Sequence, residues 1–478
     1  MKQGLLMAPK AGRLFVILGQ NGETQPRLEL GETGPGRPVA LARDLARFGS
    51  GSNAVVDAGA FIFPLKELPA LPAGDYFVQA LFDCDTDLRS ANAPGNLFST
   101  PRKVHLDPSQ TEVVRLELTD KVPPESLPPE TELVKFIKIQ SQVLSKFHGR
   151  PIFLRAGIIL PKDYEREQTR RYPLCIEIGG LNTRYTIANR LISEGSSFRR
   201  TWLGTDTPRL IMLQLDGAGP LGDPYQINSA NSGPYGDALL QELIPAVEAR
   251  FRTMGEPRGR FLTGTSTGGW VSLALQVFYP DYFNGAWSSC PDPVDFHSLQ
   301  LVNIYRDTNA YLNVHGNERL STRDVHGDAE LTMRREVGVE NLLGRGNSYT
   351  RSGEQWGEWA ATFSPRGPDG SPMPLWDPHT GQINPTVAEA WKKYDLKHIL
   401  ETDWPTLGPK LRGKIHIAAG EADQYFLNNA VHILDEFLKA ANPPFEGKIV
   451  YGPGKRHGWM DLSDLEIMKE MQAAALKK

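Results

Sequence analysis

The pattern of apolar and polar positions changes once along the chain, after about residue 118. Before that point the apolar residues fall into short β-prone runs separated by Gly, Pro and Asp. These runs predict strands over residues 13–18, 54–63, 76–82 and 112–118. The last run alternates, which is typical of an antiparallel strand with one side in water. We therefore expect residues 1–118 to form a small all-β sandwich domain.

A stiff linker is predicted over residues 119–132, because two Pro-Pro pairs lie there among charged residues. From residue 133 to residue 478 the pattern alternates between strands and helices. The continuous apolar runs at residues 172–178 and 210–215 are typical of buried parallel strands, and residues 237–251 form an amphipathic helical pattern. This order predicts an α/β domain with a mostly parallel sheet and flanking helices.

The regular alternation stops near residue 290 and resumes near residue 414. The segment between them, about 291–409, is rich in Gly, Pro, Asn and Arg, and a loop of this length is usually a functional lid or cap. Two interpretations of its tryptophans stay open: an aromatic wall over a substrate cleft, or a small satellite core. The substrate-binding candidates are Trp356, Trp359, Trp376 and Trp404, with Trp391 as a further member of the group.

One glycine-rich segment carries the strongest chemical signal. Residues 264–269 read Gly-Thr-Ser-Thr-Gly-Gly and lie between a strand-like run and an apolar helix-like run. A serine at such a tight strand-to-helix turn projects from the backbone as a nucleophile, and the glycines permit the strained dihedral angles. Ser266 is therefore the candidate nucleophile. A glycine-rich turn with an incidental serine is the alternative.

The acid and the base of a catalytic triad are expected after the serine, each on a loop that follows a late strand. The first such loop offers Asp423 as the acid, with neighbouring Glu421 as a rival and a helix N-cap as the other role for Asp423. The second loop, after strand-like residues 448–451, holds His457 in a tight turn flanked by glycines. His457 is the predicted base, although most single histidines are structural.

The oxyanion hole of such a site requires two backbone N–H donors. One is expected to be the amide of Thr267, directly after the nucleophile. The other is expected to be the amide of Leu181, because Gly179-Gly180 lets the chain turn after the first buried strand. An ordinary loop between a strand and a helix is the alternative for this second segment.

From about Phe136 to its end, the chain resembles the putative esterase family of α/β-hydrolases. That family includes S-formylglutathione hydrolases, feruloyl and acetylxylan esterases, enterochelin esterases and mycolyltransferases. The resemblance rests on four stretches: residues 172–181 at the oxyanion strand, 264–269 at the nucleophile, the Tyr-Pro-Asp-Tyr-Phe run at 279–283, and the acid and base segments at 420–423 and 457–459.

The resemblance implies an α/β-hydrolase fold and a role for each matched residue. These are Ser266 as nucleophile, Asp423 as acid, His457 as base, and Leu181 and Thr267 as oxyanion donors. The chain departs from the family at Gly179, where many members have a histidine, and in the length of its insertion. Thr267 stands where glucuronoyl esterases have an arginine, which disfavours that specificity.

Composition narrows the range of partners. Lys and Arg number 52 and Asp and Glu 56, with a net charge of −4, so no nucleic-acid partner is indicated. No apolar segment is long enough to span a bilayer. The three cysteines are in no metal-like spacing, and we expect neither a metal nor another cofactor. Oligomeric state stays open, and so does the compartment: secreted or periplasmic if a signal peptide was removed, otherwise cytoplasmic.

The leading functional hypothesis is a serine carboxylic-ester hydrolase that acts through an acyl-enzyme. Its substrate would be a small or polysaccharide-linked ester with a small to medium acyl group, such as a plant cell-wall or feruloyl-type ester. An acyltransferase would use the same triad, with a sugar or lipid hydroxyl in place of water. A non-catalytic binding protein that kept the fold is the hypothesis from another class, and a peptidase is disfavoured because the β-domain is too short for a propeller.

Overall fold

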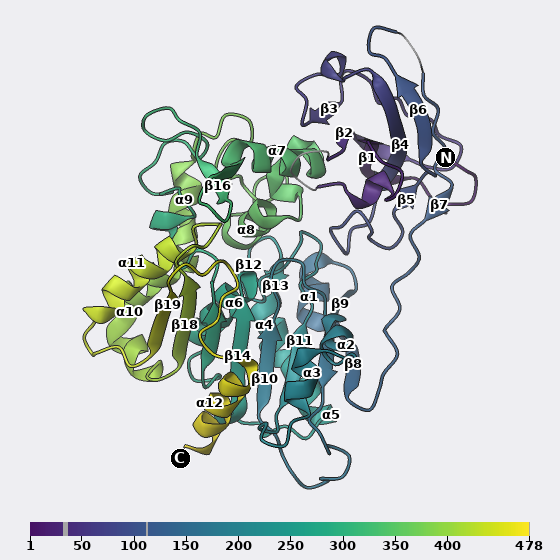
Figure 1. The fold of residues 1–478 in the computed structure, drawn as a ribbon. Helices are drawn as coiled ribbons and strands as arrows, with labels where there is room; N and C mark the ends of the chain where they lie inside the picture. Colours follow the sequence, from purple (N-terminus) through teal and green to yellow (C-terminus); the bar gives the residue numbers. More distant parts are fainter. Residues whose placement is uncertain (32–36, 111–112, 478) are drawn as a thin grey trace.

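The computed structural model describes residues 1–31, 37–110 and 113–477. Its larger sheet has eight strands in the order β19-β18-β15-β14-β10-β11-β9-β8 (Figure 1). The strands from β19 to β11 run parallel, and β9 and β8 are joined antiparallel at one edge. The strands are β8 (Val134–Ser141), β9 (Ile152–Ile159), β10 (Leu174–Ile178), β11 (Ile211–Leu215), β14 (Arg260–Thr265), β15 (Ala286–Ser289), β18 (Ile415–Gly420) and β19 (Lys448–Gly452).

Helices cover both faces of this sheet, because its central strands are apolar on both sides. On β14, Phe261 points to one apolar cluster and Leu262 to the other. The first cluster includes side chains of α2 (Ile187–Leu191), α3 (Ser197–Trp202) and α12 (Asp464–Leu476). The second includes α1 (Gln142–His148), α4 (Tyr235–Ala238), α5 (Ile244–Arg250), α6 (Thr267–Phe278) and α11 (Asn428–Lys439). The predicted α/β architecture with a mostly parallel sheet is confirmed.

The N-terminal part forms a separate antiparallel sheet. Its order is β3-β2-β1-β4-β5-β7, and β6 pairs with β4. The predicted strands at residues 13–18 and 76–82 are confirmed, and they lie within β1 and β4. The strands are β1 (Lys10–Gly19), β2 (Val39–Phe48), β3 (Phe61–Phe63), β4 (Gly74–Asp83), β5 (Leu97–Phe98), β6 (Arg102–Leu106) and β7 (Asp120–Lys121).

Two expectations for this sheet were wrong in detail. Of residues 54–63, only the last three form a strand, β3. Residues 113–118 have no strand pairing, although their alternation is real, and residues 111 and 112 lie outside the described residues. Leu116 and Leu118 pack into apolar clusters, and the Leu118 carbonyl accepts a bond from the Lys2 amide at 3.0 Å. Burial of side chains therefore fixes this segment without a strand ladder.

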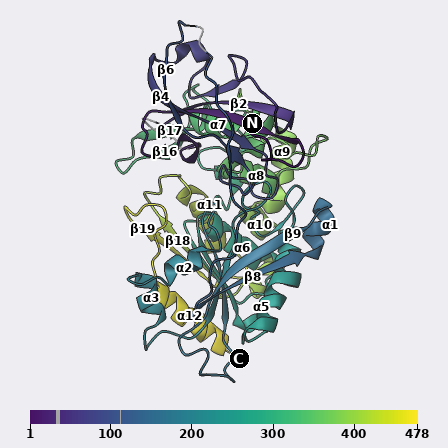
Figure 2. The ribbon, with the colours of Figure 1, turned by 90° about the vertical axis from the view of Figure 1, so that its right-hand side faces the viewer.

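The segment between β15 and β18 forms a helical region rather than an irregular loop. It contains the hairpin of β16 (Leu320–Arg323) and β17 (Ala329–Thr332), followed by α7 (Met333–Leu343), α8 (Gln355–Phe363), α9 (Pro385–Trp391) and α10 (Leu396–Lys410). Figures 1 and 2 show α7 and α8 between the two sheets. Val339 and Leu342 of α7 pack with Phe15 and Ile17 of β1. Among the helices that the structure describes, none has the length and apolar character needed to cross a bilayer.

Candidate active site

Ser266 lies at the junction of β14 and α6, at the carboxyl end of a central parallel strand. Its backbone has φ 61° and ψ −124°, a strained conformation for a residue with a side chain. The Ser266 amide donates to the Ser289 carbonyl at 3.0 Å, and its carbonyl accepts from the Asp292 amide at 3.2 Å. These bonds hold the turn, while the Ser266 side chain keeps partial solvent exposure. The arrangement is that of a nucleophile elbow.

Two glycines make this turn possible because helix and strand approach each other closely. A Cβ at Gly268 would overlap the carbonyl oxygen of Ile178 on β10. A Cβ at Gly264 would overlap the Gly268 carbonyl across the turn. Any larger residue at either position would push α6 away from the sheet, and with it the backbone that positions Ser266.

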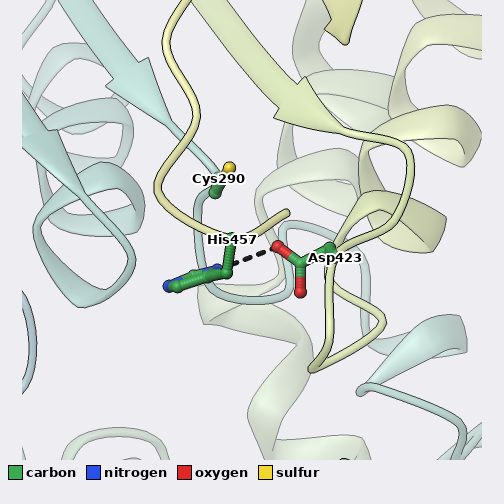
Figure 3. A group of neighbouring side chains, drawn as sticks. All are labelled: Cys290, Asp423 and His457. Atoms are coloured by element: carbon green, nitrogen blue, oxygen red, sulfur yellow. Dashed lines mark hydrogen bonds and ion pairs between the residues drawn. The ribbon is translucent and has the colours of Figure 1, made fainter. Parts of the chain in front are cut away.

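His457 and Asp423 form a hydrogen-bonded pair beside this turn (Figure 3). They lie on the loops after β19 and β18, and His457 Nδ1 is 2.8 Å from Asp423 Oδ2. The Asp423 side chain is 1% exposed and that of His457 is 14% exposed. Asp423 Oδ1 accepts from the Tyr425 amide at 2.8 Å, so the carboxylate is fixed in position. One imidazole nitrogen is thereby engaged, and Nε2 is left to act on a substrate or nucleophile.

The rival residues have other partners. Glu421 pairs with His432, at 3.1 Å between Oε2 and Nε2. His416 stacks on Trp287 with ring centroids 4.6 Å apart. Of the two candidate acids, the structure therefore brings Asp423 to His457.

Ser289 connects the Ser266 turn to the loop that carries His457. The Ser289 carbonyl binds the Ser266 amide, and its Oγ donates to the carbonyl of Trp459, two residues after His457, at 2.8 Å. Within the part of the chain that the structure describes, no hydrogen bond joins Ser266 Oγ to His457. Catalytic bonds of this kind are often long without substrate and tighten in the complex.

Cys290 is a third polar neighbour of this pair (Figure 3). Donor atoms of Cys290, Asp423 and His457 lie within 4.8 Å of one another. Burial raises the pKa of the Cys290 thiol, so it is held as a neutral thiol. A neutral thiol is a weak metal ligand and a weak nucleophile. The group therefore fits an acid–base pair better than a metal centre.

The two predicted oxyanion donors lie on segments that adjoin Ser266. Thr267 is the first residue of α6, where amide groups point out of the helix. A Cβ at Gly180 would lie 3.8 Å from Ser266 Cβ, so the loop that carries Leu181 approaches the serine. Over the described ranges, neither the Leu181 nor the Thr267 amide has a protein acceptor. Neither amide is therefore engaged by the protein itself.

Asp292 is a buried carboxylate at this site that sequence reasoning missed. Its Oδ2 accepts from Tyr225 OH at 2.6 Å and Thr267 Oγ1 at 3.2 Å. It also accepts from Trp359 Nε1 at 3.1 Å and Gln355 Nε2 at 3.3 Å. Burial raises the pKa of Asp292, and the hydrogen bonds from Tyr225 and Trp359 oppose that rise. The sequence signal for Asp292 was its position just after β15, because the carboxyl ends of parallel strands meet at one edge of a sheet.

The predicted substrate-binding tryptophans are all buried, with 1% exposure for four and 4% for Trp404. They share one apolar cluster with the main sheet, so they are not a separate satellite core. Trp359 contacts Asp292, whereas Trp356 Nε1 donates to Glu336 at 2.8 Å.

The other members of the group lie in different surroundings. Trp376 packs on Tyr349, and Trp391 Nε1 donates to Ser364 Oγ at 3.0 Å. Trp404 donates to the Pro443 carbonyl at 2.7 Å. Through Asp292, whose amide donates to the Ser266 carbonyl, Trp359 is the member of this group that is linked to the serine turn.

Comparison with known proteins gives one family. The family model described as putative esterase matches residues 154–459, which is more than half of the chain. A search of the curated proteins finds no match.

Solved structures give matches of low identity. The chain is similar to FphF, a fluorophosphonate-binding serine hydrolase of Staphylococcus aureus, with 14% identity over 72% of this chain and 98% of that one and a TM-score of 0.42. It is similar to an S-formylglutathione hydrolase from Agrobacterium tumefaciens, with 13% identity, coverages of 72% and 94% and a TM-score of 0.39. It is also similar to a ferulic acid esterase from Anaeromyces mucronatus, with 13% identity, coverages of 74% and 93% and a TM-score of 0.34.

Proposed function

The chain belongs to the putative esterase family and is a carboxylic ester hydrolase, and from this premise we propose that Ser266, His457 and Asp423 are its catalytic triad. His457 Nε2 takes the proton of Ser266 as the serine oxygen attacks the ester carbonyl. Asp423 holds the imidazole by its Nδ1 and stabilises the imidazolium that forms. The alcohol leaves with that proton, and water then releases the acyl group from the serine by the reverse sequence.

The amides of Thr267 and Leu181 bind the oxyanion of the tetrahedral intermediate in this proposal. Preorganised amides at a helix start stabilise negative charge that is absent from the substrate, and each is worth on the order of 10²–10³ in kcat. The substrate class we propose is an ester with a small to medium acyl group, including feruloyl-type esters. Two side chains of α8, Trp359 and Gln355, bind Asp292, the carboxylate that also accepts from the Thr267 hydroxyl.

The observation that carries the proposal is the His457–Asp423 hydrogen bond on two successive loops, at the same edge of the sheet as the strained Ser266 turn. A buried carboxylate whose side chain pairs with a largely buried imidazole is the pairing that a serine nucleophile needs. The rival pair, Glu421 and His432, is more exposed.

The organisation of the chain belongs to the same proposal. We propose that residues 1–118 are an accessory β-sandwich domain, residues 119–132 a linker, and residues 133–478 the catalytic domain. The segment at about 291–409 would then act as the lid. Its support is Gln355 and Trp359, which bind Asp292 directly beside Thr267.

The decisive experiment is Ser266→Ala, assayed on a panel of chromogenic esters of graded acyl length with methyl ferulate and acetylated xylan added. We expect kcat to fall on the order of 10³-fold or more with the fold intact. A fluorophosphonate probe should label the wild type and not the variant.

Exposed Ser197 provides a matched control: Ser197→Ala should keep both activity and labelling. If Ser266→Ala, correctly folded, keeps most of its turnover, the triad is wrong. If the wild type is labelled at Ser266 but hydrolyses no ester in the panel, the triad stands and the substrate class is wrong.

A further inference from the structure

Three potential metal ligands that take no part in the proposed triad meet where the two ends of the insertion come together. They are Asp295, His297 and Asp395, and their ligand atoms all lie within 4.8 Å of one another. The side chains of both aspartates are buried, whereas the His297 side chain is 46% exposed. Asp295 and His297 follow β15 at the start of the insertion, and Asp395 caps α10 near its end.

One carboxylate oxygen in this cluster lacks a partner. Asp295 Oδ1 accepts from the His297 amide at 2.8 Å and lies 2.6 Å from His297 Nδ1. Asp295 Oδ2 is buried and, among the residues that the structure describes, has no hydrogen-bond partner. A buried, unpaired carboxylate oxygen is costly, and protein groups or ligands normally satisfy it.

The second aspartate is held rigidly. Asp395 Oδ1 accepts from the His398 amide at 3.0 Å, and Oδ2 accepts from the Phe296 amide at 3.0 Å and Tyr305 OH at 2.8 Å. Each carboxylate oxygen has two lone pairs, so Oδ2 is filled by its two bonds and Oδ1 keeps one lone pair for a cation. Outer partners of this kind orient metal ligands in many proteins.

The charge around the cluster is negative. Burial, and then the charge of Asp295, raises the pKa of Asp395. Two lysines that flank Asp395 in the chain already have acidic partners, Lys392 with Glu389 at 2.8 Å and Lys397 with Glu401 at 2.8 Å. Two buried carboxylates thus lie together, and the ion-pair partner of Asp295 is His297, which is a cation only when protonated; beside a neutral imidazole this arrangement favours a bound cation.

We propose that Asp295, His297 and Asp395 bind a divalent transition-metal cation. A set of one imidazole and two carboxylates suits Zn²⁺ or Mn²⁺ better than Ca²⁺, which prefers oxygen ligands throughout. The exposed edge of His297 gives the cation a path to the buried oxygens. The cation would join the two ends of the insertion and so stabilise it, with no part in ester chemistry.

The test uses the full chain treated with EDTA and then passed into chelator-free buffer. Zn²⁺ alone, Mn²⁺ alone and Ca²⁺ alone are titrated by calorimetry, and melting temperature is followed at saturating metal. We expect one tight site for Zn²⁺ or Mn²⁺, weaker binding of Ca²⁺, and a rise in melting temperature of about 3 °C or more.

His297→Ala is the informative variant, because the side chain is half exposed and its loss leaves the fold intact. It should lose the tight site and the thermal shift while turnover of a short ester stays unchanged. The matched control is His105→Ala, which removes an exposed histidine 2.9 Å from Asp75 and should keep both effects.

Three results would overturn the proposal: absence of a stoichiometric site in the wild type, equal binding by His297→Ala, or tighter binding of Ca²⁺ than of Zn²⁺ and Mn²⁺. Co²⁺ gives a further readout, since tetrahedral or five-coordinate cobalt with an imidazole ligand has visible absorption bands. These bands should appear in the wild type and the His105→Ala control and vanish in His297→Ala.

Discussion

Removal of the Asp292 carboxylate tests how the insertion supports the proposed oxyanion hole. Four donors, on Tyr225, Thr267, Gln355 and Trp359, converge on Oδ2 at 2.6–3.3 Å. In Asp292→Ala all four lose this acceptor, and Gln355 Nε2 keeps a second one within the group, Tyr225 OH at 2.8 Å. Each buried unsatisfied donor costs about 1–3 kcal/mol before relaxation, and a broken buried charged network typically costs about 3–5 kcal/mol. We expect that loss in the free energy of unfolding.

The effect on turnover follows from Thr267, whose hydroxyl is anchored by Asp292 and whose amide is the proposed oxyanion donor. Misplacing one such donor costs on the order of 10²-fold or more in kcat. KM should change little, because a donor that acts on the developing oxyanion stabilises the transition state more than the substrate. Asp292→Asn keeps an acceptor oxygen and removes a buried charge, so it should lose about 1 kcal/mol or less and about tenfold in kcat.

The measurements are urea unfolding and steady-state kinetics on p-nitrophenyl esters, with Asp281→Ala as a control. Asp281 is exposed and pairs with Lys410 at the surface, so its removal should change neither quantity. An Asp292→Ala variant with wild-type kcat would show that Thr267 does not depend on this carboxylate. An Asp292→Asn variant as damaged as the alanine variant would show that charge, rather than hydrogen bonding, is what the site requires.

Three further predictions use other groups. Asp423→Asn should lower kcat on the order of 10³–10⁴-fold with little change in melting temperature, because the amide favours the wrong imidazole tautomer. Glu421→Gln should retain turnover. If Glu421→Gln lost turnover and Asp423→Asn kept it, Glu421 would be the acid of the triad. Trp359→Phe keeps an aromatic ring but removes the bond to Asp292, so kcat on short esters should fall, and an unchanged value would separate the insertion from the site. Burial raises the pKa of Glu177 from 4.5 to about 8, so the folded state keeps a proton that the unfolded chain releases. The free energy of unfolding should therefore fall as the pH rises from about 5 to about 8. Glu177→Gln should flatten that decline in urea unfolding, and a decline that persists would belong to another group.

The parallel sheet could be predicted because its signal is local. Residues 172–178 and 210–215 are continuous apolar runs, and they form β10 and β11 within one or two residues. The strand β2 (Val39–Phe48) was missed because its residues, rich in Ala, Leu and Arg, favour a helix by intrinsic propensity. Pairing with β1 along its whole length overrides that preference.

The candidate site likewise has one part that local sequence signals predict and another that depends on long-range packing. Ser266, Asp423 and His457 each follow a strand of the parallel sheet, so chain order alone suggests that they meet at one edge. Asp292 and Gln355 lie 63 positions apart, and no short-range pattern indicates that they touch. Asp295 and Asp395 are 100 positions apart, and their proximity likewise depends on how the insertion packs.

The N-terminal sheet reaches this site through Arg89, which lies between β4 and β5. Its guanidinium donates to the carbonyls of Arg351 at 2.9 Å and Leu343 at 2.5 Å, both in the insertion, and pairs with Asp83. Burial lowers the pKa of Arg89 to about 10, so at neutral pH it is still charged, and each of these acceptors is matched to a cation. Replacing it would leave those groups unpaired within the interface.

The segment that Arg89 holds continues directly into the site. A Cβ at Gly353 would overlap the Arg89 side chain, and the Gly353 carbonyl accepts from Asn182 Nδ2, next to the proposed oxyanion donor Leu181, at 3.5 Å. Two residues later, Gln355 binds Asp292. The N-terminal sheet therefore supports the proposed oxyanion hole from outside, through backbone carbonyls rather than through any group that touches the substrate. Because the segments that carry both proposed oxyanion donors contact residues 353–355, we expect changes in that sheet to act on kcat through the geometry of the hole rather than through the triad.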